Sequence, residues 1–501
     1  MAAPLQCLAL LAALGAAGSA CESRSAAETP DPSSIAVAAA PTPQASDGRV
    51  EPPPPPKPTV DDPPPETAPP SKPSVRAAPP PEPELPPEPE PVLEHRRARR
   101  PMMVYVEPRL GTPFRGKIQV GEVFELYETV PGEDCRGADW GRVAQAAYVC
   151  LRHTEPTDDD ALALPHTLAD GLAPFLYARL RPKDARGAPP PAPVYRSRVA
   201  MRRGDPPESE LQPEHDYAFV GRRVYRDGAV LRAPNGRVVR ERDVKRMKPS
   251  DFAGRDTLER PIPEGATMAW SITWPYAFVR EQPSADAPER SRLPLHDEFL
   301  VQGEPRSVRG EDWYPVTSPV QGWVSEAEMR HWVDLPGPAE LGPEQVWLDV
   351  DLDQQMLALR RGASIEFMTL VSSGNWKHGT PVGLYRIEGK WAWADMRSRA
   401  GDDETYSVAG VPWAMYFRGR YALHGTFWHN RFGRRTSHGC VNLSAHDARW
   451  VYERILPVAK PGFITTNEHA VEPGTLVRIR KGTEPPPDRR RPPVGATSPA
   501  P

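Results

Sequence analysis

The sequence predicts a mostly β protein, built from several small modules behind a long proline-rich segment. Short runs that alternate apolar and polar residues, divided by glycines, recur from residue 102 onward, as is typical of strands. Helical patterns are rare: the evident one is ARWVYERILP, at residues 448–457, and we expect one or two short helices in all. The 66 prolines among 501 residues are concentrated near the front, so much of that part is not expected to fold.

Residues 1–20 have the features of a secretory signal. They form an apolar stretch that is too short to span a bilayer with polar flanks, and it ends in Gly18, Ser19 and Ala20. Cys21 follows where cleavage would occur, and a small-small-Cys ending resembles the lipobox of bacterial lipoproteins. We expect export to the periplasm or cell envelope, with Cys21 either a lipidated anchor or a free residue beside the cut.

Residues 21–101 consist mainly of Pro, Glu, Ala and Ser, with almost no aromatic residue. Such a segment cannot bury enough apolar surface to fold, so we expect a disordered, extended tether that separates the rest of the chain from its anchor. The last residues, 482–501, are expected to be a disordered tail.

Two stretches are predicted to be small β modules, residues 102–153 and 263–334. RGADWGRV at residues 136–143 matches RGEDWYPV at residues 309–316, a weak local repeat. Both stretches resemble bacterial SH3-like modules, which often precede cell-wall enzymes. Two interpretations stay open: spacer modules whose tryptophans are core, or modules that recognise wall peptides or glycan.

Residues 154–262 form an uncertain insert between these two modules. Part of it, DARGAPPPAPVYRSR, has the composition of a linker, whereas residues 216–240 indicate hairpins with a turn at Asn235-Gly236. Its role is left open.

Cysteine usage separates a structural pair from a single thiol. In an oxidising compartment Cys135 and Cys150 can form a disulfide. In the chain-entropy model, closing this loop stabilises the folded state by about 3 kcal/mol. Cys440 then remains unpaired, and an unpaired thiol in an exported protein calls for a chemical role.

Residues 344–481 are strand-rich and of the size of a catalytic domain. A helix is expected after Asn442, because Ser444 can cap it and Asp447 lies in its first turn.

Cys440 has the surroundings of a nucleophile. It ends a turn made of Ser437, His438 and Gly439, whose successive backbone N–H groups could form an anion-binding nest. A thiol needs a base, and His424, at the end of an apolar strand and before Gly425, is the best candidate. The other histidines of this region are His429, His438 and His446.

Zinc is the alternative use of one cysteine and several histidines. The spacing argues against it, because His438 and Cys440 are too close for a typical ligand pair and no C-x-x-C or H-x-x-x-H element accompanies them. We expect no metal and no cofactor.

The motifs of this region resemble those of a known family. HGT at residues 424–426, SHGCVN at residues 437–442 and TPVG at residues 380–383 are similar to the catalytic motifs of L,D-transpeptidases with the YkuD fold. The resemblance covers residues 344–481 and implies a YkuD-like β-sandwich catalytic domain. The loop at residues 427–435 looks like a compact version of the region that borders the acceptor side in this family.

The resemblance also implies roles for single residues. Cys440 would be the nucleophile and His424 the proton acceptor and donor, with its ring oriented by the carbonyl of Gly425. The N–H groups of Gly439 and Cys440 would hold the oxyanion. The supporting residues would be His438, Gly425, Gly439, Ser437 and Asn442.

Three further residues are predicted to contact substrate. Arg434 and Arg435 precede the motif and could attract stem carboxylates, and Trp428 could form a wall of the cleft. For the arginines, a solvated basic loop is the alternative; for Trp428, a place in the core.

By resemblance, the substrate is a peptidoglycan stem tetrapeptide. Cys440 would attack the carbonyl of its third residue, release D-alanine, and pass the acyl group to an amine, giving a 3–3 cross-link or attachment to a wall-linked or outer-membrane protein. Two alternatives stay open: hydrolysis of the same thioester, as a carboxypeptidase or endopeptidase, and a non-catalytic wall-binding protein. The net charge of −4 gives no case for nucleic acid, and contact with a membrane is expected only through a lipid anchor.

Overall fold

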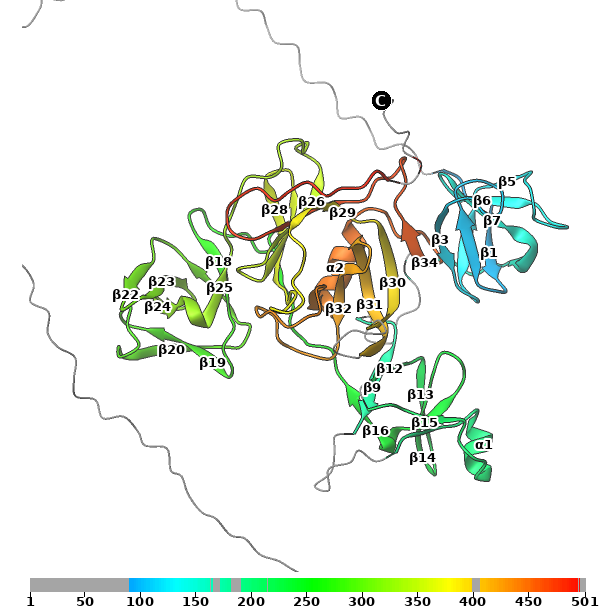
Figure 1. Cartoon of the computed structure of the whole chain (residues 1–501), viewed down its shortest axis with the longest axis horizontal. Helices are drawn as coiled ribbons and strands as arrows, with labels where there is room; N and C mark the ends of the chain where they lie inside the picture. Colours follow the sequence, from blue (N-terminus) through cyan, green and yellow to red (C-terminus); the bar gives the residue numbers. More distant parts are fainter. Residues whose placement is uncertain are drawn as a thin grey trace, which may run out of the picture. The chain divides into compact units, whose positions relative to one another are not determined.

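The computed structural model describes residues 90–162, 164, 172–181, 191–213, 215–398, 406–493 and 495 (Figure 1). The chain is mostly β in this part, as the sequence predicts, with two α-helices among the described residues. None of the described helices is long and apolar enough to cross a membrane. The signal, Cys21 and the tether up to residue 89 lie outside the described residues.

The first module begins earlier than residue 102, because residues 94–98 already form a strand. Its Trp140 is fully buried, and the indole N–H donates to the carbonyl of Glu133 at 2.8 Å. Cys135 and Cys150 form a disulfide, with Cα atoms 5.5 Å apart. Its strands are β1 (Glu94–Ala98), β2 (Met102–Tyr105), β3 (Phe114–Ile118), β4 (Val123–Leu126), β5 (Glu128–Val130), β6 (Trp140–Ala144), β7 (Ala147–Cys150) and β8 (Thr154–Pro156).

The second module forms an eight-stranded sheet with its own core. Trp313 is buried like Trp140, so both repeat tryptophans serve packing. Its strands are β18 (Thr267–Ser271), β19 (Tyr276–Arg280), β20 (Glu289–Pro294), β21 (Glu298–Val301), β22 (Arg306–Val308), β23 (Glu311–Ser318), β24 (Gly322–Ser325) and β25 (Met329–His331).

The stretch between these modules is folded where it is described. It contains helix α1 (Arg198–Arg203) and a three-stranded sheet of β13, β14 and β15. Its strands are β9 (Leu176–Leu180), β10 (Pro193–Val194), β11 (Ser209–Glu210), β12 (His215–Phe219), β13 (Gly221–Tyr225), β14 (Gly228–Arg232), β15 (Val238–Arg240), β16 (Val244–Met247) and β17 (Arg255–Asp256).

The C-terminal part packs two sheets and one helix around a common core. One sheet has six strands in the order β17-β28-β27-β26-β35-β29. The core joins Leu348 and Leu357 of this sheet to Trp413 and Leu423 of the other, and Val451 of helix α2 packs among them. The elements are β26 (Val346–Asp351), β27 (Met356–Arg361), β28 (Ser364–Leu370), β29 (Gly383–Arg386), β30 (Gly389–Arg397), β31 (Ser407–Arg418), β32 (Tyr421–Thr426), β33 (Val441–Ser444), α2 (Ala445–Arg454), β34 (Phe463–Asn467) and β35 (Leu476–Arg480).

Helix α2 begins as the sequence predicts. The hydroxyl of Ser444 accepts the backbone N–H of Asp447 at 3.0 Å, which satisfies one of the free donors of the first turn. The carboxylate of Asp447 is fully buried and accepts from Thr369 Oγ1 at 2.5 Å and from the N–H of Gly254 at 2.8 Å. Helix α2 is thereby fixed to β28 and to the residues that follow β16.

The second sheet of this part extends into the upstream modules. Its order is β16-β9-β12-β31-β30-β34-β3-β2-β7-β6-β5, and β32 pairs with β31 and β33. At one end β12 pairs in parallel with the start of β31, where Asp216 is in register with Val408. At the other end β3 pairs with β34. The upstream segments therefore continue the sheet that carries the candidate site.

The expected C-terminal tail is partly ordered. The N–H of Leu384 donates to the carbonyl of Pro487, and the N–H of Arg489 donates to the carbonyl of Leu384, both at 2.9 Å. Residues 487–489 thus run along β29, where its open edge supplies the backbone partners.

Candidate active site

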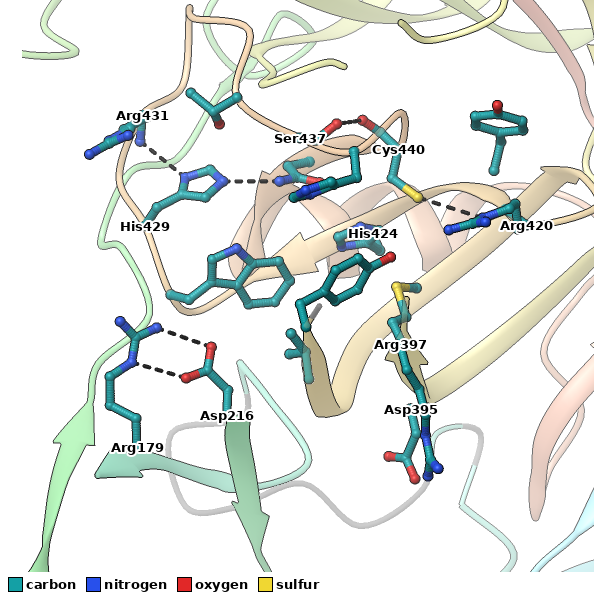
Figure 2. Close-up of a pocket in the computed structure, with 18 of the residues that line it drawn as sticks. Arg179, Asp216, Asp395, Arg397, Arg420, His424, His429, Arg431, Ser437 and Cys440 are labelled. Carbon is teal, nitrogen blue, oxygen red and sulfur yellow. Dashed lines mark hydrogen bonds and ion pairs between the residues drawn. The ribbon is translucent and has the colours of Figure 1, made fainter. Parts of the chain in front are cut away.

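Strand pairing brings Cys440 and His424 to one face. Strand β33 runs parallel to β32, with Leu423 opposite Val441 and His424 opposite Asn442. Side chains alternate along a strand, so Cys440, two residues before Asn442, points to the same side as Asn442 and His424. Both Cys440 and His424 line a cavity of about 660 Å³, which we call the catalytic cavity (Figure 2).

Hydrogen bonds fix the turn that carries Cys440. The hydroxyl of Ser437 donates to the carbonyl of Cys440 at 2.5 Å and accepts the N–H of Gly439 at 3.1 Å. Thr380 Oγ1 donates to the carbonyl of Gly439 at 2.9 Å. Gly439 has a φ of +113°, and a Cβ there would lie 2.6 Å from the ring of Tyr421, so only glycine fits.

The same bonds change the expected role of Gly439. The resemblance implied that the N–H of Gly439 holds the oxyanion. In the structure this N–H donates to Ser437 Oγ and is therefore not available to an oxyanion. The difference arises from the serine side chain, which folds back over the turn that it precedes.

His424 is held as a neutral ring. The residue is 2 % exposed, and Nδ1 lies 3.1 Å from the carbonyl oxygen of Gly425, to which it donates. Burial lowers the pKa of His424 to about 4, although the contact with Gly425 opposes the shift. With the proton on Nδ1, Nε2 is the atom left to accept one.

Cys440 rests as a thiol. The residue is partly exposed, and its Sγ lies 3.7 Å from the carbonyl oxygen of Arg420. Burial of the sulfur raises the pKa of the Cys440 thiol, while the backbone of Ala422 and the charge of Arg420 act in the opposite direction. With the thiol and the imidazole of this cavity both neutral, an attack by the sulfur would need its proton to leave during the attack rather than beforehand.

Asn442 bridges the motif to the preceding loop. Its backbone N–H and C=O both pair with Ser372, at 2.9 Å, and its amide lies 2.9 Å from Nε2 of His429. Nδ1 of His429 accepts the backbone N–H of Arg431 at 3.2 Å. Burial, with smaller electrostatic effects of the neighbouring His424 and Arg431, lowers the pKa of His429 to about 4. His429 thus links the loop to β33 as a neutral ring.

His438 and a group of aromatic side chains line another part of the catalytic cavity. The ring of His438 lies 5.0 Å from that of Tyr406 and 4.9 Å from that of His378. Tyr416 also lines the cavity, and burial and the nearby Cys440 raise the pKa of its hydroxyl to about 12. Neither tyrosine belongs to a motif that points to this site; for Tyr416, the alternation of residues along β31 is the sequence signal.

Arg434 and Arg435 do not line the catalytic cavity, which corrects the expectation that they meet substrate there. Arg434 donates to the carbonyl of Ile272 at 2.8 Å, in the second module. Arg435 forms an ion pair with Asp353 at 2.9 Å and donates to the carbonyl of Leu352. Both side chains brace the loop from its outer side. The arginines that line the cavity are Arg179, Arg397, Arg420 and Arg431.

Trp428 lines the catalytic cavity, with its ring 5.8 Å from that of His424. His446 lies elsewhere and contacts Asp447 at 3.3 Å. In the part of the chain that the structure describes, no three His, Cys, Asp or Glu residues form a group that could hold a metal ion.

One wall of the catalytic cavity is formed by residues of the insert at 154–262. Arg179 of β9 and Asp216 of β12 face each other across the two strands, with bonds of 2.9 and 3.0 Å (Figure 2). Both side chains line the cavity. Sequence reasoning missed this pair, because nothing local places residues 179 and 216 beside residue 424.

Residues 345–479 match the family model YkuD, the L,D-transpeptidase catalytic domain. In this segment the chain is similar to the L,D-transpeptidase catalytic domain of the YkuD type. A curated relative, "Putative L,D-transpeptidase YciB" of Bacillus subtilis (strain 168), is 25% identical to the chain over 133 residues, which are 23% of this chain and 64% of the relative. The chain therefore spans less than two thirds of that relative's length.

Solved structures of L,D-transpeptidases also show similarity to part of this chain. The catalytic domain from E. faecium L,D-transpeptidase has 21% sequence identity and a TM-score of 0.22, covering 27% of this chain and 98% of that one. An L,D-transpeptidase from Mycobacterium smegmatis has 20% identity and a TM-score of 0.23, covering 47% of this chain and 89% of that one.

Proposed function

We propose that the protein is a peptidoglycan L,D-transpeptidase of the cell envelope, with Cys440 as nucleophile and His424 as general base. The observation that carries this proposal is that His424 of β32 and Cys440, which immediately precedes the paired strand β33, line one cavity. The match of residues 345–479 to the L,D-transpeptidase catalytic domain supports the substrate class, a peptidoglycan stem peptide.

In the first half-reaction, Sγ of Cys440 attacks the carbonyl carbon of the third residue of a stem tetrapeptide. Nε2 of His424 takes the thiol proton and delivers it to the nitrogen of the departing D-alanine. We assign the oxyanion to the backbone N–H of Cys440, since that of Gly439 is bound to Ser437. A thioester on Cys440 and free D-alanine result.

In the second half-reaction an amine attacks the thioester carbonyl. The C–N bond forms as the C–S bond breaks, and the amine proton passes through His424 to the sulfur. If water took the place of the amine, the product would be a shortened stem peptide. The disulfide between Cys135 and Cys150 supports an oxidising location outside the cytoplasm. Lipidation at Cys21 belongs to the same proposal.

The test is mass spectrometry of the full chain with a tetrapeptide donor, with and without an amine acceptor. We expect an acyl adduct on Cys440, and a joined product when the amine is present. Cys440→Ala should lose both while its thermal unfolding stays close to that of the parent. Turnover that persists in Cys440→Ala contradicts the proposal. Water as the main acceptor would favour the hydrolase, and wall binding without any adduct would favour a non-catalytic protein.

A further inference from the structure

A second cavity, of about 850 Å³, adjoins the catalytic cavity. Four residues line both: Arg179, Trp428, His429 and Asn430. These side chains form the border between the two spaces, so a ligand in the second cavity lies next to the one that holds Cys440 and His424.

The second cavity is built mainly by residues outside the matched catalytic domain. Residues 245–253 form one side, Leu295 and His296 of the second module contribute to it, and residues 427–430 of the catalytic domain close it. No motif of the catalytic domain specifies such a space, so it is a property of this chain's upstream modules.

The loop that closes the second cavity is anchored along its length. Phe427 stacks on Tyr177, with ring centroids 3.5 Å apart. Ser250 Oγ donates to the side-chain oxygen of Asn430 at 2.6 Å. Phe432 packs on Phe252, with centroids 5.5 Å apart, and on His296. The cavity is therefore held open before any ligand arrives, which lowers the entropic cost of binding.

The charge of the second cavity favours an anionic ligand. Four cationic side chains line it, and Asp251 is the acid among its lining residues. Asp251 pairs with Lys248 at 2.7 Å, and both of these side chains are well exposed. The four cations are Arg179, Lys245, Arg246 and Lys248; Arg179 is paired with Asp216 and Arg246 lies 3.7 Å from Glu241, both acids outside this lining. Carboxylates suit such a set, because lysine and arginine both bind them by charge-assisted hydrogen bonds.

The position of His424 decides which substrate belongs there. In the proposed reaction His424 gives a proton to the leaving amine and later takes one from the incoming amine, so both amines must reach the same ring. That ring faces Trp428, which borders the second cavity. A smaller cavity of about 240 Å³ is lined by Lys377, His378 and His438 among others. His424 lines neither this cavity nor the second one, but Trp428, the neighbour of the His424 ring, lines only the second of these two.

We propose that the second cavity binds the amine acceptor, a peptide that carries a primary amine together with at least one carboxylate. This inference rests on the proposed transpeptidase function. The carboxylate lies against Lys245 and Lys248, and the amine passes Trp428 towards the thioester. Its nitrogen then bonds to the acyl carbon, the C–S bond of Cys440 breaks, and the proton moves to the sulfur by way of His424.

The experiment compares the full chain with Lys245→Glu/Lys248→Glu. The matched control is Arg223→Glu/Arg226→Glu, which makes the same change of charge on exposed residues in and next to β13, outside the lining of this cavity. For each protein, thioester formation with the tetrapeptide donor alone is followed by mass spectrometry. Transfer is then measured against the concentration of a stem peptide with a free side-chain amine.

We expect the lysine variant to raise the KM for the acceptor at least tenfold, with an unchanged rate of thioester formation and a normal control variant. An unchanged acceptor KM overturns the inference. Equal losses in thioester formation and transfer also overturn it, because the cavity would then serve the donor. Absence of a Cys440 thioester in the unaltered protein overturns the proposed function itself, and is seen before any acceptor is added.

Discussion

The ring of Tyr177 lies flat against that of Phe427, with centroids 3.5 Å apart and planes 7° from parallel. Tyr177 belongs to β9, in the upstream insert, and Phe427 follows His424, the proposed base, by three residues. The phenol of Tyr177 also donates to the carbonyl of Gly410 at 2.7 Å. A side chain from outside the catalytic domain thus supports the loop that leads from His424 to Cys440.

Removal of the Tyr177 ring should destabilise this loop. Tyr177→Ala deletes a side chain that is 2 % exposed, and we expect a loss of about 3 kcal/mol in the free energy of unfolding, measured by urea denaturation. Tyr177→Phe keeps the stack and loses only the hydroxyl, so it should cost about 1 kcal/mol. Equal midpoints for Tyr177→Ala and the parent would contradict a supporting role.

Thr380 should affect catalysis without touching substrate. Its hydroxyl donates to the carbonyl of Gly439 and accepts the N–H of Gly374, both at 2.9 Å. Thr380→Val breaks both bonds and should slow thioester formation about tenfold, equivalent to about 1.4 kcal/mol. Thr380→Ser keeps the hydroxyl and should restore most of the rate. A valine variant as fast as the parent would show that the turn does not need this brace.

The rate of thioester formation should fall at a lower pH than it would if an ordinary histidine were the base. His424 must be neutral to accept the thiol proton, and burial lowers its pKa to about 4. The rate should therefore hold as the pH falls from about 7 to about 5 and decline only near pH 4. A stopped-flow pH series on the full chain measures this. A decline centred near pH 6.5 would mean that another group, or a solvated His424, controls the reaction.

Stability should begin to fall at a higher pH than the rate of thioester formation does. His296, His331, His424 and His429 are each buried enough that their pKa values are lowered to about 4. In the unfolded chain a histidine takes up its proton near pH 6.5, so the unfolded state binds more protons between about pH 4 and pH 6.5. The stabilisation from neutral, buried histidines is complete above about pH 6.5 and is lost as the pH falls through this window.

Urea midpoints at about pH 7.5, 5.5 and 4.5 measure this loss. His296→Asn removes one of the four groups, and asparagine tolerates the φ of +69° at this position. The variant should show a shallower pH dependence than the parent. Identical slopes would indicate that His296 contributes nothing to it.

The disulfide should matter for stability and little for chemistry. Cys135→Ser/Cys150→Ser opens a link across 15 residues, and the chain-entropy model predicts a loss of about 3 kcal/mol in the first module. Thioester formation on Cys440 should continue at the parent rate while that module remains folded. A large loss of acylation under conditions where the module is folded would instead assign it a direct part in the site.

Local sequence signals predicted the turn and the helix cap at the candidate site and did not predict what borders its cavity. The turn at residues 437–440 and the helix cap at Ser444 depend on neighbouring residues, so their patterns could be read directly. Arg434 lies beside the motif in sequence, but its direction is decided by a carbonyl at residue 272, which no local pattern reveals.

The wall formed by Arg179 and Asp216 depends on even more distant contacts. Strand β12 joins β31 through a two-residue parallel register, His215 with Ser407 and Asp216 with Val408. A pairing of two residues that lie far apart in the sequence produces no hydrophobic pattern in either segment, so it could not be predicted from periodicity.

The continuation of the sheet by β12 and β3 also reduces the risk of aggregation through edge strands. An edge strand offers unpaired N–H and C=O groups on which another chain can add its own strand, and this leads to aggregation. Here β3 covers β34 and β12 covers the start of β31. A fragment cut to residues 344–481 would expose both edges. We therefore expect this fragment to self-associate more readily than the chain that contains β3 and β12.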